Sequence, residues 1–212
     1  MLYEPEVSLE KQLAKAVEIL LSGGVVAYPT DTVYGLGAVY NNVTAIQRVY
    51  AIKGRSHIKA LPLIVADYEQ LDEITASINA CGRLLMRSFW PGALTLVLPR
   101  SNRVTDDITG GADTIAARMP DHPVPLALAR RTGRAICATS ANISGQKSTI
   151  IARDVLKGLG SSVDYIISHG KTGCGIPSTL VDATAEVPVI IREGFITREQ
   201  INRVCKSFYR EA

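Results

Sequence analysis

The sequence lacks clustered metal ligands. Its 212 residues include four cysteines, none of them in a C-x-x-C pair, and three histidines. A structural zinc site needs clustered thiolates or imidazoles, so we expect no metal ligated by protein side chains. Scattered cysteines in a chain of this size are typical of a reducing compartment, which favours a cytoplasmic protein.

Long apolar runs are also absent. Lys, Pro or Gly interrupts every apolar stretch well before 18 residues, so no membrane span is predicted. The first ten residues contain acids and no apolar core, unlike a signal peptide. A net charge of +3 is too small a surplus to identify a nucleic-acid partner by itself. The length favours one domain over residues 1–212.

The common catalytic signatures are missing too. The sequence contains no G-x-x-x-x-G-K-[ST] loop, no G-x-G-x-x-G after a strand and no G-x-S-x-G elbow. The sequence therefore offers neither a P-loop nor a Rossmann fingerprint, and its three histidines leave few ways to build a Ser-His-Asp set. What is present is a series of polar loops, each placed just after an apolar strand.

Hydrophobic periodicity predicts interleaved helices and strands. Apolar spacing indicates helices at 9–21, 42–52, 78–89, 124–131 and 155–159, and Asp67 opens a further polar helical stretch. Thr197 and Gln200 form a capping box that starts the last helix. Strands are expected at 25–28, 61–65, 93–98, 114–118, 135–138, 165–168, 179–182 and 187–191, the last two as a hairpin. Because the order is not a strict βαβ alternation, the pattern predicts a mixed α/β sheet with helices packed on it.

The first polar loop is P-T-D-T-V-Y-G-L-G at residues 29–37. Thr30, Asp31, Thr32 and Tyr34 place oxygen atoms at the carboxyl end of a strand, where open α/β sheets bind ligands. An ordinary strand-to-helix turn, with the threonines bonded locally, explains the same residues.

The second loop is Lys53-Gly54-Arg55. Both cations can reach one anion if the loop turns, because Lys supplies a point charge and Arg a planar fork. Charge pattern alone favours a solvated surface triplet.

The third loop is A-T-S-A-N-I-S-G at residues 138–145. Four of its residues carry a hydroxyl or amide and follow a predicted buried strand directly in the sequence: Thr139, Ser140, Asn142 and Ser144. A helix cap with an Asx-turn explains part of this cluster but not four such residues in six.

A last set comprises Arg118 at a strand end, Ser178 after a proline, and Arg192 before Glu-Gly. Strand-end arginines often pair with a nearby acid. Taken with Lys53 and Arg55, however, these residues form a cation-rich and histidine-poor group suited to phosphate esters. The residues themselves therefore predict an anion- or nucleotide-binding site.

The amino-acid sequences of these loops, taken in order, resemble those of the YrdC-like family, and the resemblance extends over nearly the whole chain. The matching stretches, in order, are P-T-D-T-V-Y-G-L-G, K-G-R, P-L-I-V, W-P-G-A-L-T, R-M-P, T-S-A-N-I-S-G, P-S-T and I-R-E-G. The resemblance implies a twisted, mostly parallel-stranded sheet with flanking helices around a concave basic cleft. It also implies a nucleotidyltransferase that forms threonylcarbamoyl-AMP and pyrophosphate from L-threonine, bicarbonate (or CO₂) and ATP. A downstream transferase complex would use the product to modify tRNA.

The resemblance also assigns site residues. Those implied to hold threonine are Thr32, Arg118, Ser140 and Ser178. Those implied to contact ATP are Lys53, Arg55, Thr114, Ala138, Ser148 and Arg192. The family's K-x-R and S-x-N hallmark, implied to be catalytic, corresponds to Lys53, Arg55, Ser140 and Asn142. Mg²⁺ is expected to be carried by the phosphates, because the sequence has no acidic cluster.

The sequence departs from the family pattern at two places. Residues 56–61 form a longer step after K-G-R than in the family, and Ala66 stands where a histidine often follows P-L-I-V. Two other functions stay open: a non-catalytic module that binds double-stranded RNA or tRNA, and a paralogue that forms carbamoyl-adenylate. The longer members carry a second C-terminal domain, for which we expect no room here.

Overall fold

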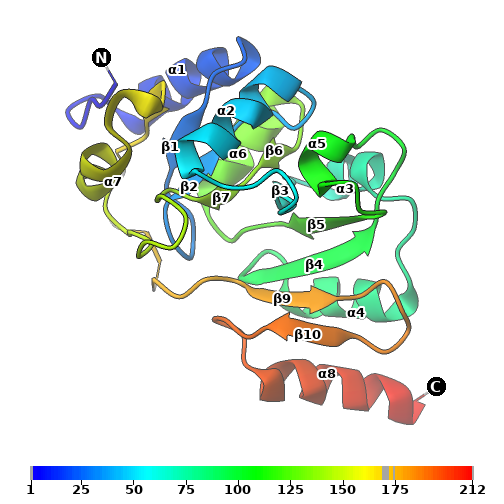
Figure 1. The fold of residues 1–212 in the computed structure, drawn as a ribbon. Coiled ribbons are helices and arrows are strands. Elements are labelled where there is room, and N and C mark those ends of the chain that lie inside the picture. The colour runs from blue at the N-terminus through cyan, green and yellow to red at the C-terminus, as the bar shows by residue number, and fades with distance from the viewer. Residues whose placement is uncertain (1, 169–171, 174, 212) are drawn as a thin grey trace.

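The structure is a computed structural model that describes residues 2–168, 172, 173 and 175–211 (Figure 1). Its helices are α1 (Leu9–Leu21), α2 (Val43–Lys53), α3 (Tyr68–Ile74), α4 (Ala80–Phe89), α5 (Asp106–Thr109), α6 (Pro123–Thr132), α7 (Ala152–Leu159), a 3₁₀ turn (Gly160–Ser162) and α8 (Arg198–Glu211). Its strands are β1 (Val26–Tyr28), β2 (Gly35–Gly37), β3 (Leu63–Ile64), β4 (Leu94–Pro99), β5 (Thr114–Arg118), β6 (Ile136–Cys137), β7 (Thr139–Ser140), β8 (Tyr165–Ile166), β9 (Thr179–Asp182) and β10 (Val189–Arg192).

The strands form two sheets. One has the order β7-β2-β1-β8 and the other the order β10-β9-β4-β5-β3-β6. The mixed α/β class predicted from the sequence is confirmed. The strand pairing differs from the implied one, because β1–β8, β3–β5 and β4–β9 pair in parallel whereas the other five pairs are antiparallel. Short connections such as the one between β9 and β10 favour antiparallel neighbours.

The six-stranded sheet has two different faces. Along β5, Ile115 and Ala117 are buried in the main hydrophobic core, together with neighbours from β4 and β9. Thr114, Ala116 and Arg118 alternate with them and therefore point to the opposite face. The strand predicted at 114–118 matches β5, and its alternation leaves one sheet face available to line a site.

Helices cover the sheets and fix their ends. In Figure 1, α1, α2 and α6 surround the four-stranded sheet, whereas α4 and α8 lie against the lower strands of the six-stranded sheet. Asn42, Asp67 and Asn79 cap the N-termini of α2, α3 and α4 through side-chain oxygens. The Thr197–Gln200 capping box is present, with reciprocal bonds of 2.8 and 3.3 Å.

Two strands, β2 and β7, were not predicted from the sequence. β2 reads Gly-Leu-Gly, a composition with low strand propensity, and it is stabilised by pairing with the nearby β1 and with the distant β7. At Gly37 a Cβ would lie 2.1 Å from the carbonyl oxygen of Cys137, so only glycine lets the chains approach this closely. The amide of Cys137 donates to the Ala38 carbonyl at 2.9 Å, and this contact joins the two sheets.

Candidate functional site

A cavity of about 430 Å³ lies between the free face of the six-stranded sheet and the loops that follow β1, α2 and β6. Nine of the eleven residues that the resemblance implied line it: Thr32, Arg55, Thr114, Arg118, Ala138, Ser140, Ser148, Ser178 and Arg192. They come from segments spread over 160 residues of sequence. The structure thus brings nine of the implied residues together and leaves Lys53 and Asn142 outside the lining of this cavity.

The floor of the cavity is formed by alternate residues of neighbouring strands. Thr114, Ala116 and Arg118 come from β5, and Thr95 and Val97 from β4. Val97 and Ala116 are direct cross-strand partners, so they share a face. The floor thus presents small and hydroxyl-bearing side chains, with one arginine at its end.

A bulge in β10 directs Arg192 toward this floor. The register runs from Ile190 opposite Val181 to Arg192 opposite Leu180, so one extra residue is inserted in β10. Directly opposed residues of antiparallel strands share a face, and Leu180 lines the cavity. Arg192 therefore points inward, and its Nη2 donates to the Ser178 carbonyl at 2.9 Å.

Arg118 is held by Asp31, Thr32 and Gly92. Its Nη2 lies 2.6 Å from Asp31 Oδ2, its Nη1 donates to Thr32 Oγ1 at 3.1 Å, and its Nε donates to the Gly92 carbonyl at 2.9 Å. The side chains of Arg118 and Asp31 are only 10% and 14% exposed. The ion pair fixes the guanidinium plane at the edge of the cavity, since paired buried charges have little freedom.

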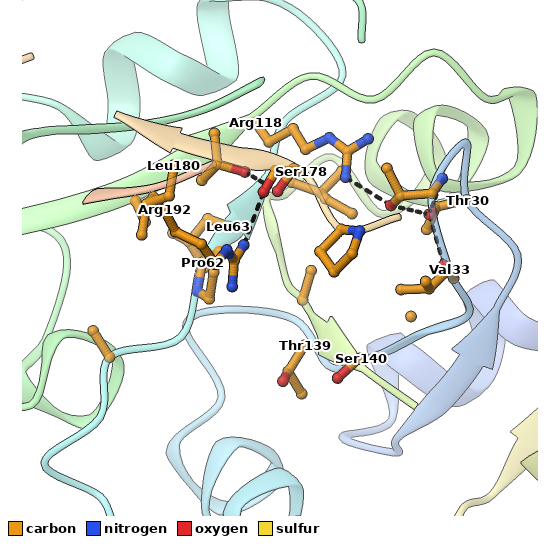
Figure 2. Close-up of a pocket in the computed structure, with 18 of the residues that line it drawn as sticks. Thr30, Val33, Pro62, Leu63, Arg118, Thr139, Ser140, Ser178, Leu180 and Arg192 are labelled. Carbon is orange, nitrogen blue, oxygen red and sulfur yellow. Dashed lines mark hydrogen bonds between the residues drawn. The ribbon is translucent and has the colours of Figure 1, made fainter. Parts of the chain in front are cut away.

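The cavity has two distinct ends. Figure 2 shows Arg118 beside Thr30 on one side and Arg192 beside Leu180 on the other, with Ser178 between them. Two separate cationic ends suit a ligand, or a pair of ligands, with two anionic groups.

Lys53 does not line this cavity. It is the last residue of α2, and Gly54 follows in the left-handed conformation, which turns Lys53 and Arg55 apart. The Lys53 ammonium donates to the carbonyls of Ser140 and Asn142 at 2.5 and 2.7 Å. Burial, reinforced by the nearby Arg55 charge, lowers its pKa from 10.5 to about 8. Lys53 thus holds the turn that carries the S-x-N residues.

Arg55 reaches the cavity and anchors the unusually long segment behind it. Its Nη2 donates to the Ala60 carbonyl at 2.9 Å, whereas its buried Nε has no hydrogen-bond partner among the described residues. Tyr50 donates to the Lys59 carbonyl at 3.0 Å, and its ring packs against the tilted ring of His57, with centroids 4.3 Å apart. The 56–61 segment is therefore folded back onto α2, and Ala60 joins the cavity wall.

Asn142 faces a neighbouring cavity that shares Ser148 with the first. Its amide nitrogen donates to the carbonyls of Ile143 and Gln146, at 2.9 and 2.8 Å. Its Oδ1 is buried without a hydrogen-bond partner in the part of the chain that the structure describes. An unused buried acceptor costs free energy, so this oxygen is placed to accept from a group that enters the site.

Sequence reasoning missed Thr95. Its hydroxyl lies 2.7 Å from that of Ser178, and both side chains are buried. The available signal was a threonine inside the apolar run L-T-L-V-L, at a position that alternates with core residues. Ala66, which stands in place of the family's histidine, is buried and is not among the residues that line the cavity.

The described residues include no cluster of three His, Cys, Asp or Glu side chains that could hold a metal ion. Within the same residues, no helix has the length and apolar character needed to cross a membrane.

Comparisons with known proteins agree with this geometry. A family model for Sua5, YciO and YrdC, described as "Telomere recombination", matches residues 18–194. The threonylcarbamoyl-AMP synthase of Bacillus subtilis is 42% identical over 196 residues, which cover 92% of this chain and 57% of that protein. The chain thus spans little more than half the length of that relative. The synthase of Idiomarina loihiensis is 38% identical over 170 residues, which cover 79% of this chain and 91% of that protein.

Solved structures give the same result. The crystal structure of P. abyssi Sua5 complexed with L-threonine superposes with a TM-score of 0.89 at 39% identity, covering 96% of this chain and 59% of that one. The crystal structure of E. coli YciO superposes with a TM-score of 0.82 at 27% identity, covering 94% and 97% of the two chains. Matching motifs, fold and family model lead to one conclusion: the chain belongs to the Sua5/YciO/YrdC family.

Proposed function

We propose that the chain is a threonylcarbamoyl-AMP synthase, which joins L-threonine, bicarbonate and ATP and releases pyrophosphate. Relatives that carry this name are 38–42% identical to it, and one of them is covered over 91% of its length. The proposal includes the nucleotidyltransferase class, a cytoplasmic location and the use of the product to modify tRNA.

The observation that carries the proposal is the convergence of three arginines with neutral hydroxyls on one cavity. Arg55, Arg118 and Arg192 line it, and none of the lysines that the structure describes does. Transfer of a nucleotidyl group needs positioning and neutralisation of phosphate charge more than acid–base groups. Planar guanidinium groups supply both, because they donate two parallel hydrogen bonds to phosphate or carboxylate oxygens.

The Arg118 end suits the amino acid. A guanidinium fixed by Asp31 can take the carboxylate of threonine, and the hydroxyls of Thr32 and Ser178 lie within the same cavity. A site built to bond a substrate hydroxyl discriminates against analogues that lack it more sharply than a site that senses a missing methyl. Threonine would therefore be separated from valine more strongly than from serine.

The Arg55 and Arg192 end suits ATP. The buried Nε of Arg55, which has no partner among the described residues, is a donor that a phosphate oxygen can use. Thr114 and Ala138 leave room on the floor and wall for the nucleoside. Mg²⁺ would enter with the ATP phosphates, because no carboxylate cluster is found in the described chain.

The reaction proceeds in two bond-forming steps. The neutral amine of threonine attacks CO₂ derived from bicarbonate and loses a proton, which forms a carbamate. A carbamate oxygen then attacks the α-phosphorus of ATP, and the bond to the bridging oxygen breaks, so that pyrophosphate leaves with its electron pair. Arg55 and Arg192 would stabilise the charge on the phosphates, while Lys53 holds the Ser140–Asn142 turn in place.

The test is pyrophosphate release by the purified chain, measured with all three substrates and with each left out in turn. Release that requires both threonine and bicarbonate, together with threonylcarbamoyl-AMP detected by mass spectrometry, is the expected result. Release that ignores threonine would refute the proposal, and release that requires an added carbamoyl donor in place of threonine would favour formation of carbamoyl-adenylate. No release, together with tight binding of double-stranded RNA or tRNA, would favour the binding module.

A further inference from the structure

We propose that Thr30 is a positioning residue that makes the Thr32 hydroxyl an acceptor toward the ligand, and that this acceptor takes the amino group of the substrate amino acid. The inference rests on the proposed function. It follows from counting the protons and lone pairs of two neighbouring hydroxyls at the Arg118 end of the cavity.

Thr30 uses its full hydrogen-bonding capacity inside its own loop. Its Oγ1 lies 2.7 Å from the Val33 carbonyl oxygen, which can only accept, so the single hydroxyl proton of Thr30 is directed there. The same oxygen accepts from the Thr32 amide at 3.1 Å and lies 3.0 Å from Thr32 Oγ1. A hydroxyl has one proton and two lone pairs, so Thr30 accepts both contacts from Thr32.

The donor in the contact between the two hydroxyls is therefore Thr32. Its proton points at Thr30, and one of its lone pairs accepts from Arg118 Nη1 at 3.1 Å. Thr32 lines the cavity, and these bonds leave one lone pair on its oxygen. As long as the Thr32 hydroxyl donates its proton to Thr30 Oγ1, Thr32 can accept a hydrogen bond from a ligand but cannot donate one.

The position of this acceptor selects the group that it binds. It lies beside the Arg118 guanidinium, which suits a carboxylate, and the amino nitrogen of an α-amino acid is separated from its carboxylate by a single carbon. An acceptor next to a carboxylate site therefore matches the amino group. Figure 2 shows the chain of contacts from Arg118 through the two threonines to Val33.

The proposal makes the two interpretations of the 29–37 loop compatible, because each applies to a different threonine. Thr30 is bonded locally, as in an ordinary turn, and this local bonding sets the hydrogen-bonding direction of Thr32 at the ligand.

The experiment compares two ligands across three variants by isothermal titration calorimetry on the full chain. The ligands are L-threonine and (R)-3-hydroxybutanoate, which is L-threonine without its amino group. The variants are Thr30→Val, which removes the hydroxyl at nearly constant shape, Thr30→Ser, which keeps it, and Thr75→Val. The last is a matched control, because Thr75 is buried away from the cavity and donates to the Leu71 carbonyl at 2.9 Å.

Thr30→Val should weaken threonine binding about 10-fold, the size of one hydrogen bond to a charged group. The same variant should leave the affinity for (R)-3-hydroxybutanoate within about 2-fold of the unaltered value, because this ligand has no amino group for the Thr32 acceptor to bind. Thr30→Ser and Thr75→Val should bind both ligands like the unaltered chain. A merely structural role of Thr30 would weaken both ligands together.

Equal loss for the two ligands, or unchanged threonine binding in Thr30→Val, would overturn the assignment while the proposed function stands. If Thr30→Val does not fold, Thr32→Val should show the same selective loss of affinity for threonine, and an equal loss for both ligands would again refute it. No threonine binding by the unaltered chain would refute the proposed function and this inference with it.

Discussion

Lys53→Met tests whether the buried ammonium acts through the Ser140–Asn142 turn or on a phosphate. Methionine is an unbranched apolar side chain that fills irregular space, so the change removes mainly the charge and its donors. The ammonium lies 2.5 and 2.7 Å from the carbonyl oxygens of Ser140 and Asn142, and the side chain is absent from the cavity wall. We therefore expect the turn to shift while the phosphate subsite keeps its arginines.

The expected change in stability is small because two contributions oppose each other. A pKa lowered from 10.5 to about 8 means that the charged form of Lys53 costs the fold about 3 kcal/mol. Removing the charge recovers this free energy, but two buried carbonyls then lose a donor at about 1–3 kcal/mol each. The free energy of unfolding should change by between a gain of about 1 and a loss of about 3 kcal/mol.

The effect on turnover should be larger than the effect on stability. A displacement of about 1 Å in a positioned group can reduce the rate by about 100-fold. Pyrophosphate release by Lys53→Met should therefore lose about this factor in kcat, with KM for ATP within about 3-fold of the unaltered value. Lys15→Met, which breaks a solvent-accessible ion pair with Glu4, is the matched control and should leave turnover unchanged. A 10-fold or larger rise in KM for ATP at unchanged kcat would show that Lys53 acts on phosphate directly.

Three further predictions follow from the same contacts. The pKa of Lys53 is lower in the folded chain than in the unfolded chain, so between about pH 8 and 10.5 the unfolded chain binds the extra proton. The free energy of unfolding of the unaltered chain should therefore rise with pH relative to that of Lys53→Met. If urea unfolding at pH 7.5, 9 and 10.5 gives the same pH dependence of this free energy for both chains, the prediction is contradicted. Gly37→Ala should lower the free energy of unfolding by about 3 kcal/mol in urea, because its Cβ would lie 2.1 Å from the Cys137 carbonyl oxygen. Gly158→Ala has open space around its Cβ and should be neutral or slightly stabilising. Similar values for the two variants would refute the packing argument. Arg55→Ala should raise KM for ATP at least about 10-fold and KM for threonine much less, and the reverse order in pyrophosphate-release kinetics would move Arg55 to the amino-acid end.

The sequence predicts the elements whose signal is local. The alternation in T-I-A-A-R predicts β5 and the face that carries Thr114 and Arg118, and the Thr197–Gln200 pair predicts the start of α8. The family resemblance carried by eight ordered motifs also implies which residues share a site. Nine of those residues line one cavity.

Other features depend on partners far away in the chain. β2 is only Gly-Leu-Gly, and besides the nearby β1 its strand conformation depends on β7, which lies about a hundred residues further along the chain. The partners of Lys53 lie 87 and 89 residues further along the chain, so the local charge pattern, which favours a solvated surface triplet, does not reveal its buried contacts. The direction in which the Thr32 hydroxyl donates depends on the hydrogen bonds that Thr30 and Arg118 make with it, and no sequence pattern encodes these contacts.

The bulge in β10 has a second consequence beyond the aim of Arg192. β10 is the outermost strand of its sheet, and Val189 and Ile191 on it are 60% and 55% exposed. An exposed, apolar edge strand with regular spacing can serve as a template for aggregation, because its unpaired amide and carbonyl groups can pair with strands of other chains. The inserted residue breaks the even spacing of those groups. One irregularity in four residues thus directs Arg192 into the site and makes this edge of the sheet a poor template for aggregation.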